Sequence, residues 1–210
     1  MQDVDEKLIL DYLHASSAAY PVFPVYKIGN ESYVDGGYRN NLPIDLAIKM
    51  GAEEIVAVKL DSFPKTPQHK DLMYLPIVKL IEPTWPLGFI LNFKQDIINK
   101  SMILGYLDAQ KAFGVKLGVR YTFENTPIPT YFSSEFLKRL LELGISNYDK
   151  IIEILKWQKV SIQNRDEYFL RGVEVLGEIL ELDPFKSYGV SEYFECIKSK
   201  ILYLKKLKSI

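Results

Sequence analysis

Cysteine and histidine are scarce in this 210-residue sequence, which contains only Cys196, His14 and His69. A single cysteine cannot form an internal disulfide bond, so the protein tolerates a reducing compartment and we expect it in the cytoplasm. Three scattered residues of these types do not have the spacing of a zinc site, and no metal site is expected.

An excess of charge is also absent, because 26 basic residues balance 27 acidic residues and the net charge is −1. Nucleic-acid binding usually requires a basic excess or a basic stripe, so we expect no nucleic-acid partner. The acidic N-terminus, MQDVDEKLIL, lacks the basic flank and the apolar centre of a signal peptide.

Long hydrophobic runs are missing as well. Every apolar stretch is short and interrupted by charges, and none reaches the roughly 18 residues that a membrane-spanning helix needs. Any membrane contact is therefore expected to be peripheral. Lysines near the C-terminus could touch an anionic membrane surface, although lysines late in a helix more often face solvent. These lysines are Lys198, Lys200, Lys205, Lys206 and Lys208.

The pattern over the first 60 residues predicts alternating helices and strands. We expect a helix over residues 3–17 and a β-hairpin with strands 25–28 and 32–34, because Gly29-Asn30 is a typical turn pair. A helix over residues 42–50, opened by Asn41 and Pro43 and ended by Gly51, should follow. The β-branched run 54–60 predicts a strand that is buried on both faces, and we interpret residues 33–60 as a βαβ unit.

The rest of the chain is predicted to be mainly helical. We expect a short helix over residues 71–81, a long helix over residues 92–113 that ends at Gly114, and one strand over residues 115–123. The pattern over residues 133–207 predicts four helices. In the last of these, one apolar stripe contains Tyr193, Ile197, Ile201 and Leu204.

The most informative stretch runs from Asp11 to Leu60, because several short motifs occur there in a fixed order. An isolated Asp-Gly-Gly is common in plain turns, and Asp35 alone could be a turn or capping residue. The whole ordered block resembles the aspartate block of patatin-like phospholipases. Its pieces are Ala15-Ser16-Ser17-Ala18-Ala19-Tyr20-Pro21, Phe23-Pro24, Tyr33-Val34-Asp35-Gly36-Gly37, Asn41-Leu42-Pro43 and Gly51-Ala52-Glu53-Glu54.

The resemblance implies hydrolysis of lipid acyl esters by a serine–aspartate dyad. A serine hydroxyl is a weak nucleophile until a nearby base takes its proton. In the resembled family an aspartate is that base, which implies that Asp35 is the catalytic base and that Gly36 and Gly37 shape its loop, with positive φ angles if required. No organic cofactor is implied, and neither His14 nor His69 is expected to be catalytic.

The partner of this aspartate is missing from the sequence. The family's serine lies in a G-x-S-x-G motif, which occurs nowhere in these 210 residues, and the family's glycine-rich oxyanion loop is also absent. Both motifs precede the aspartate block in the family, and this chain starts only 34 residues before Asp35. We therefore expect a fragment, a truncated gene product or one part of a split protein that is inactive alone.

The resemblance also implies the fold class, which is α/β. We expect part of a patatin-like three-layer sheet domain over residues 1–130, followed by an all-helical region of unassigned role over residues 131–210. The resemblance extends more weakly to about residue 114. Trp85, Phe89 and Phe93 are interpreted as core residues, with the lining of an acyl-chain pocket as the alternative.

An incomplete sheet should expose the edge and one apolar face of strand 54–60, and such surfaces associate. We expect the chain to bind the missing N-terminal half or to self-associate. The alternative is a non-catalytic interaction protein that retains the patatin-like fold without the nucleophile.

Overall fold

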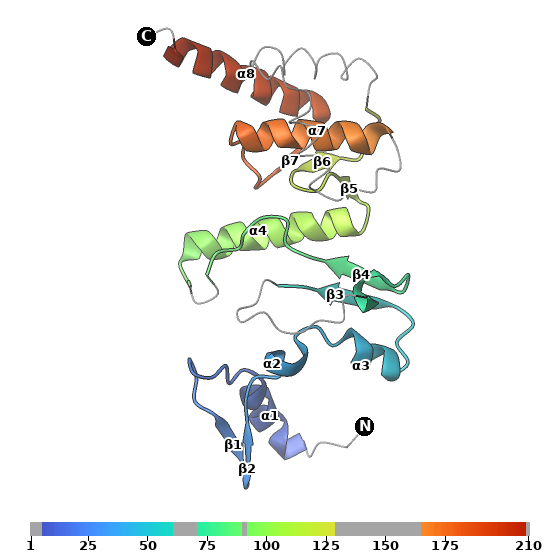
Figure 1. The fold of residues 1–210 in the computed structure, drawn as a ribbon, viewed down its shortest axis with the longest axis vertical. Helices are drawn as coiled ribbons and strands as arrows, with labels where there is room; N and C mark the ends of the chain where they lie inside the picture. The colour runs from blue at the N-terminus through green and yellow to red at the C-terminus, as the bar shows by residue number, and fades with distance from the viewer. Residues whose placement is uncertain (1–5, 61–70, 90–91, 129–164, 209–210) are drawn as a thin grey trace. The chain divides into compact units, whose positions relative to one another are not determined.

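The computed structural model describes residues 6–60, 71–89, 92–128 and 165–208 (Figure 1). The chain divides into two compact units, Met1–Glu82 and Pro83–Ile210. Each unit has its own cluster of buried apolar side chains. The α/β class predicted from the sequence is confirmed, whereas the predicted domain boundary near residue 130 stays a prediction.

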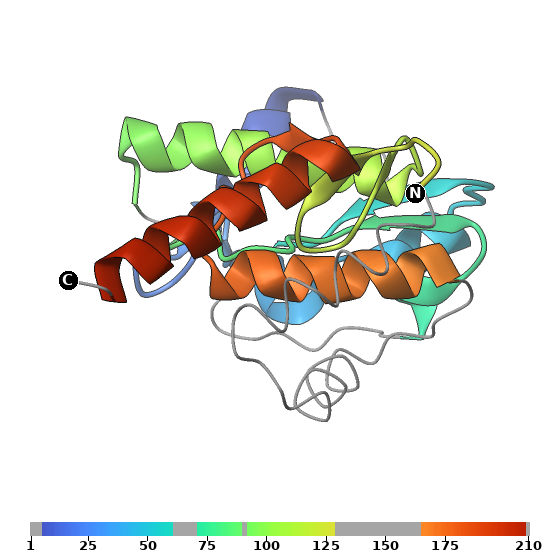
Figure 2. The ribbon, with the colours of Figure 1, turned by 90° about the horizontal axis from the view of Figure 1, so that it is seen from above.

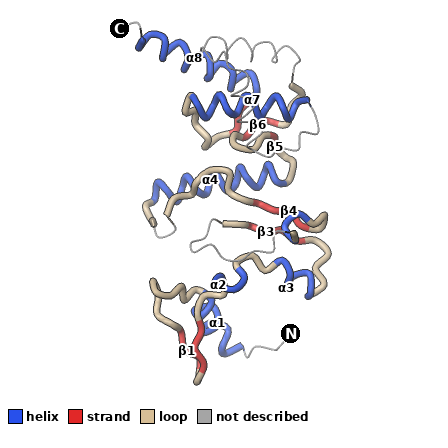
Figure 3. The backbone as a smooth tube through the Cα atoms, in the orientation of Figure 1, coloured by secondary structure: helices blue, strands red, loops and turns tan. Residues whose placement is uncertain are grey.

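The first unit begins as predicted with a helix and a hairpin (Figure 3). A 3-10 turn at Glu6–Leu8 leads into helix α1, Ile9–Ser16, and the antiparallel strands β1, Tyr26–Ile28, and β2, Glu31–Tyr33, follow. Gly29 stands in the turn with a φ of +61°, a conformation that glycine adopts without steric penalty. The Gly29-Asn30 signal was therefore sufficient to place this hairpin.

Two short helices follow the hairpin, α2 at Gly37–Asn40 and α3 at Ile44–Lys49. The end of α3 is fixed by Gly51, whose φ is +84° and whose N–H donates to the carbonyl of Ile48 at 2.9 Å. The next N–H, of Ala52, donates to the carbonyl of Ala47 at 3.1 Å, which completes a Schellman motif. The predicted stop at Gly51 is confirmed, and the helix begins two residues later than predicted.

The predicted βαβ unit over residues 33–60 is wrong, because its two strands belong to different sheets. Strand β2 pairs with β1, whereas strand β3, Ile55–Val58, pairs in parallel with β4, Val78–Ile81. The predicted helix over residues 71–81 is also wrong. Pro76 cannot continue a helix, and the β-branched residues that follow it form β4 against β3.

Strand β3 is buried on one face only, contrary to the expectation of two buried faces. Ala57 is 5% exposed, but Val56 and Val58 on the opposite face are 57% and 56% exposed. Within the described part of the chain, β3 has β4 as its single partner strand. Among the residues that the structure describes, nothing pairs with the other edge of the strand, and one of its apolar faces is exposed.

The second unit combines helices with one small sheet. Figures 1 and 2 show helices α7 and α8 lying next to each other and close to the yellow hairpin of β5 and β6. The elements are α4 (Gln95–Ala112), β5 (Lys116–Leu117), β6 (Thr122–Glu124), α7 (Arg165–Ile179), β7 (Ser187–Tyr188) and α8 (Val190–Lys208). Among the described residues, no helix is both long and apolar enough to cross a membrane.

The small sheet corrects two details of the sequence-based expectation. The single strand predicted over residues 115–123 is split into β5 and β6, which pair as an antiparallel hairpin. Strand β7 then pairs in parallel with β6. The C-terminal region, predicted to be entirely helical, therefore contributes a two-residue strand, and the predicted helices between residues 133 and 164 lie outside the described residues.

The core of the second unit is rich in aromatic side chains that pack edge to face. Tyr193 has ring-centroid distances of 5.3 Å to Tyr121, 5.0 Å to Phe123 and 4.9 Å to Tyr188. The predicted stripe of α8 is confirmed for Tyr193, Ile197 and Ile201, which are at most 2% exposed. Its last member, Leu204, is 41% exposed.

A buried carboxylate on α7 explains why strand 115–123 is broken. Glu174 is 1% exposed, and its Oε1 accepts the N–H of Val119 at 2.6 Å and the N–H of Tyr121 at 3.0 Å. Burial raises the pKa of the Glu174 carboxyl, whereas these two hydrogen bonds and the Arg171 guanidinium oppose the rise. Both N–H groups are used by Glu174 and not by a strand, so the chain turns at Gly118, which has a φ of +96°.

Replacement of Gly118 by a residue with a side chain should destabilise this hairpin. A Cβ at this position would clash with the carbonyl oxygen of Tyr121 and would lie 2.9 Å from the Glu174 carboxylate. We expect Gly118→Ala to lower the free energy of unfolding by about 3 kcal/mol or more, through the left-handed backbone and overpacking together. Chemical denaturation measures this change.

Gly114→Ala is the matched control, because Gly114 has a φ of +70° and its Cβ would have no atom within 4 Å. This variant should lose only about 1 kcal/mol, the cost of the left-handed conformation. Equal losses in the two variants would contradict the packing described around Gly118.

Candidate functional site

Asp35 lies in a loop that two contacts hold against the segment after α1. The backbone N–H of Asp35 donates to the carbonyl of Ala18 at 3.0 Å. The hydroxyl of Tyr38 donates to the carbonyl of Tyr20. Ala18 is 4% exposed, so its small side chain lets the two segments approach closely. The loop is thereby fixed on both sides of the aspartate.

The Asp35 carboxylate is held by one of its two oxygens. Its Oδ1 accepts the backbone N–H of Gly37 at 2.7 Å, the typical bond of an Asx turn. Within the described part of the chain, no hydrogen bond reaches Oδ2. The side chain is half-buried. One oxygen is therefore oriented by the backbone, and the other keeps its lone pairs available within the described chain.

The two glycines after Asp35 have different roles. A Cβ on Gly37 would lie 2.9 Å from Asp35 Oδ1 and 3.1 Å from Asn41 Oδ1, whereas a Cβ on Gly36 would have no atom within 4 Å. Neither glycine has a positive φ, and that of Gly36 is −61°. The possibility that these glycines supply positive φ angles is not realised, and Gly37 is instead needed for the close approach to the carboxylate.

The remaining candidates from the sequence lie elsewhere. His14 stacks on Tyr26 with a ring-centroid distance of 5.7 Å, and His69 lies outside the described residues. Trp85 packs against the core of the second unit, as interpreted. Phe89 and Phe93 are 67% and 75% exposed, so their interpretation as core residues is wrong.

Sequence reasoning assigned no role to Ala18 or Tyr38, although both help to hold the loop. The signal for Ala18 was present, because it stands inside the ordered block that carries the family resemblance. Tyr38 gave no such signal, since a tyrosine after Asp-Gly-Gly has no predictable partner. The described residues include no group of three potential metal ligands.

The family model of patatin-like phospholipases matches residues 1–48 of this chain. This segment contains Asp35, Gly36 and Gly37, so the predicted resemblance is confirmed there and the segment is patatin-like. The match ends inside α3, and the weaker resemblance up to about residue 114 stays a prediction. No curated protein and no solved structure matches the chain.

A methyl group on Gly37 should displace the Asp35 carboxylate, because the carboxylate is the nearer and more easily moved neighbour. We expect Gly37→Ala to change the 13C chemical shift of the Asp35 carboxyl group and to weaken the bond from the residue 37 N–H. Gly36→Ala, one residue away, should leave both unchanged because its Cβ points into open space. Similar spectra for the two variants would refute the proposed role of Gly37.

Proposed function

We propose that this chain supplies the aspartate half of a patatin-like lipid acyl hydrolase, and that a separate segment supplies the serine. The geometry of Asp35 carries the proposal: one carboxylate oxygen is fixed by the Gly37 N–H, and the other accepts no hydrogen bond within the described chain. A general base needs both properties, a fixed position and an available lone pair. The family match over residues 1–48 supports the substrate class.

The proposed reaction uses the available oxygen of Asp35 twice. The carboxylate takes the proton of the serine hydroxyl while the serine oxygen attacks the ester carbonyl. The same proton then passes to the departing alcohol, which leaves an acyl-serine. In the second half, Asp35 takes a proton from water, the resulting hydroxyl attacks the acyl group, and the serine leaves with the proton. The products are a fatty acid and an alcohol.

The surface of the first unit supports the need for another segment. No G-x-S-x-G motif occurs in the sequence, so the nucleophile has to come from elsewhere. Several large apolar side chains of this unit are exposed by half or more of their area. They are Leu10 at 69%, Leu13 at 60%, Val56 at 57%, Tyr20 at 57%, Val22 at 57% and Val58 at 56%. Apolar surface of this kind is typical of contact sites.

Esterase activity on p-nitrophenyl butyrate tests this function. The full chain alone should be inactive. Mixed with an upstream-encoded segment that carries the glycine-rich loop and the G-x-S-x-G serine, it should release p-nitrophenol. Asp35→Asn in that mixture should reduce kcat by about 10²-fold or more, because general base catalysis typically contributes that much.

Asp45→Asn is the matched control, since it removes one half-buried carboxylate of the same unit, which is bonded to Asn40 and Lys49. Its activity should stay within about twofold, because surface substitutions away from a site change little. Hydrolysis by the chain alone would show that it contains its own nucleophile and would contradict the proposal that a separate segment supplies the serine. An inert but folded stoichiometric complex would favour the non-catalytic interaction protein.

A further inference from the structure

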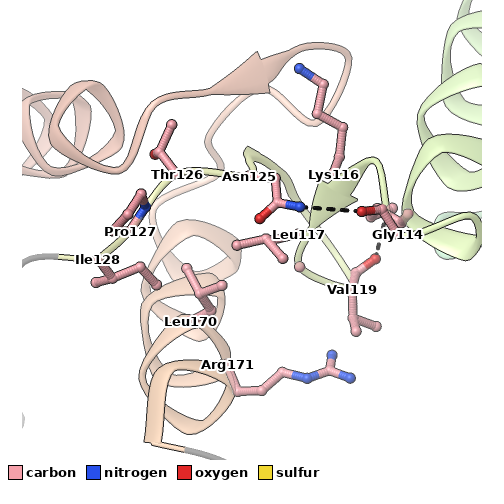
Figure 4. Close-up of a pocket in the computed structure, with 12 residues that line it drawn as sticks. Gly114, Lys116, Leu117, Val119, Asn125, Thr126, Pro127, Ile128, Leu170 and Arg171 are labelled. Atoms are coloured by element: carbon pink, nitrogen blue, oxygen red, sulfur yellow. Dashed lines mark hydrogen bonds between the residues drawn. The ribbon is translucent and has the colours of Figure 1, made fainter.

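The second unit contains a cavity of about 700 Å³ that the proposed hydrolase function does not use (Figure 4). Its walls come from the end of α4, the β5–β6 hairpin, residues 125–128 and the first half of α7. A volume of this size is typical of sites for small organic molecules. All of its described lining residues belong to the second unit, so the cavity is independent of the Asp35 loop.

The cavity has a basic lining. Lys111, Lys116 and Arg171 are among its described lining residues, and those residues include no aspartate or glutamate. Two of these cations have ion-pair and hydrogen-bond partners within the protein. Lys111 Nζ lies 2.9 Å from Asp108 Oδ1 and donates to the carbonyl of Val119 at 2.6 Å, and Lys116 pairs with a glutamate at the hairpin.

Arg171 is the exception. Its side chain is 11% exposed, and its single contact within the described chain joins Nη1 to Glu174 Oε2 at 3.4 Å, at the long end of the hydrogen-bond range. Its Nε is buried and has no hydrogen-bond partner among the residues that the structure describes. The other oxygen of Glu174 is already used by two backbone N–H groups. A guanidinium has five N–H donors, and within the described chain only one nitrogen of Arg171, Nη1, reaches an acceptor.

Most of the other described lining residues are apolar side chains or glycines, and Asn125 and Thr126 are polar. Leu117, Val119, Ile128 and Leu170 line the cavity together with Arg171, and Figure 4 shows Leu170 and Arg171 on consecutive positions of the same helix. The buried Nε has no hydrogen-bond partner within the described chain, and an acceptor from outside the protein can satisfy it. The planar fork of the guanidinium matches the two oxygens of a carboxylate or of a phosphate.

We propose that this cavity binds a small amphipathic anion, a carboxylate or phosphate carried on an apolar chain. The head group accepts hydrogen bonds from the Arg171 guanidinium, and the apolar chain lies against the leucine, valine and isoleucine walls. Because the cavity lies outside residues 1–48, failure of the hydrolase proposal would leave this inference unaffected.

Isothermal titration calorimetry on the full chain tests the site with four probes. Octanoate and octyl phosphate have both the anion and the apolar chain, whereas 1-octanol lacks the charge and inorganic phosphate lacks the chain. We expect at least one of the first two to bind about tenfold or more tightly than either single-feature probe. The ratio between octanoate and octyl phosphate distinguishes a carboxylate ligand from a phosphate ligand.

Arg171→Gln should reduce the affinity for the preferred anion to that for 1-octanol. Arg39→Gln, the same change at an exposed arginine of the first unit, should leave the affinity unchanged. Arg171→Lys retains the charge and loses the planar fork, and it should bind the anion several-fold more weakly.

Three results would overturn the proposal. These are equal affinities for octanoate, octyl phosphate and 1-octanol, an unchanged affinity in folded Arg171→Gln, and no binding of any probe at 10 mM. If circular dichroism shows that Arg171→Gln is unfolded, Arg171→Lys decides, and an affinity equal to that of the native chain would then reject the role of Arg171.

Discussion

The carboxylate of Glu174 is the contact on which the second unit depends. It crosses 55 and 53 positions of sequence to accept the N–H groups of Val119 and Tyr121. Without it, the buried N–H of Tyr121 and the part-buried N–H of Val119 would have no acceptor among the described residues, a costly arrangement. The turn that it stabilises brings Tyr121 and Phe123 into the core against Tyr193. The same carboxylate also contacts Nη1 of Arg171 through its other oxygen, so it joins the hairpin to the guanidinium at the cavity.

This dependence also explains which parts of the fold the sequence could predict. Glycine and proline act on the backbone locally, and the hairpin turn at Gly29 and the helix ends at Gly51 and Gly114 were predicted from them correctly. The strand over residues 115–123 has a good local pattern, but a glutamate on a distant helix competes for its N–H groups. The parallel pairing of β3 with β4 likewise joins segments that no local signal connects. Such long-range contacts override the secondary-structure preference of the local sequence.

The candidate site was predictable to a greater extent, because the family resemblance rests on an ordered block and not on one residue. Asp35 and its two glycines were identified from that block, and the family match over residues 1–48 confirms the resemblance there. The structural role of each glycine was not predictable. Gly37 is needed because the carboxylate folds back onto its own N–H, a bond that depends on the rotamer of Asp35. Sequence alone specifies no rotamer.

The two units differ in how much apolar surface they bury, and this difference bears on the proposed function. Among the described residues, fifteen form the buried cluster of the second unit, whereas Ile44, Ala57 and Met73 form that of the first. A catalytic base has to be held in position by a rigid scaffold. Backbone hydrogen bonds hold Asp35 within its loop, but the described part of the first unit has a small core and an exposed apolar face at Val56 and Val58. A segment that covers this face would bury apolar area and stiffen the unit. Under the proposed function, the contact that delivers the serine would therefore also rigidify the base, so assembly and activity would be coupled.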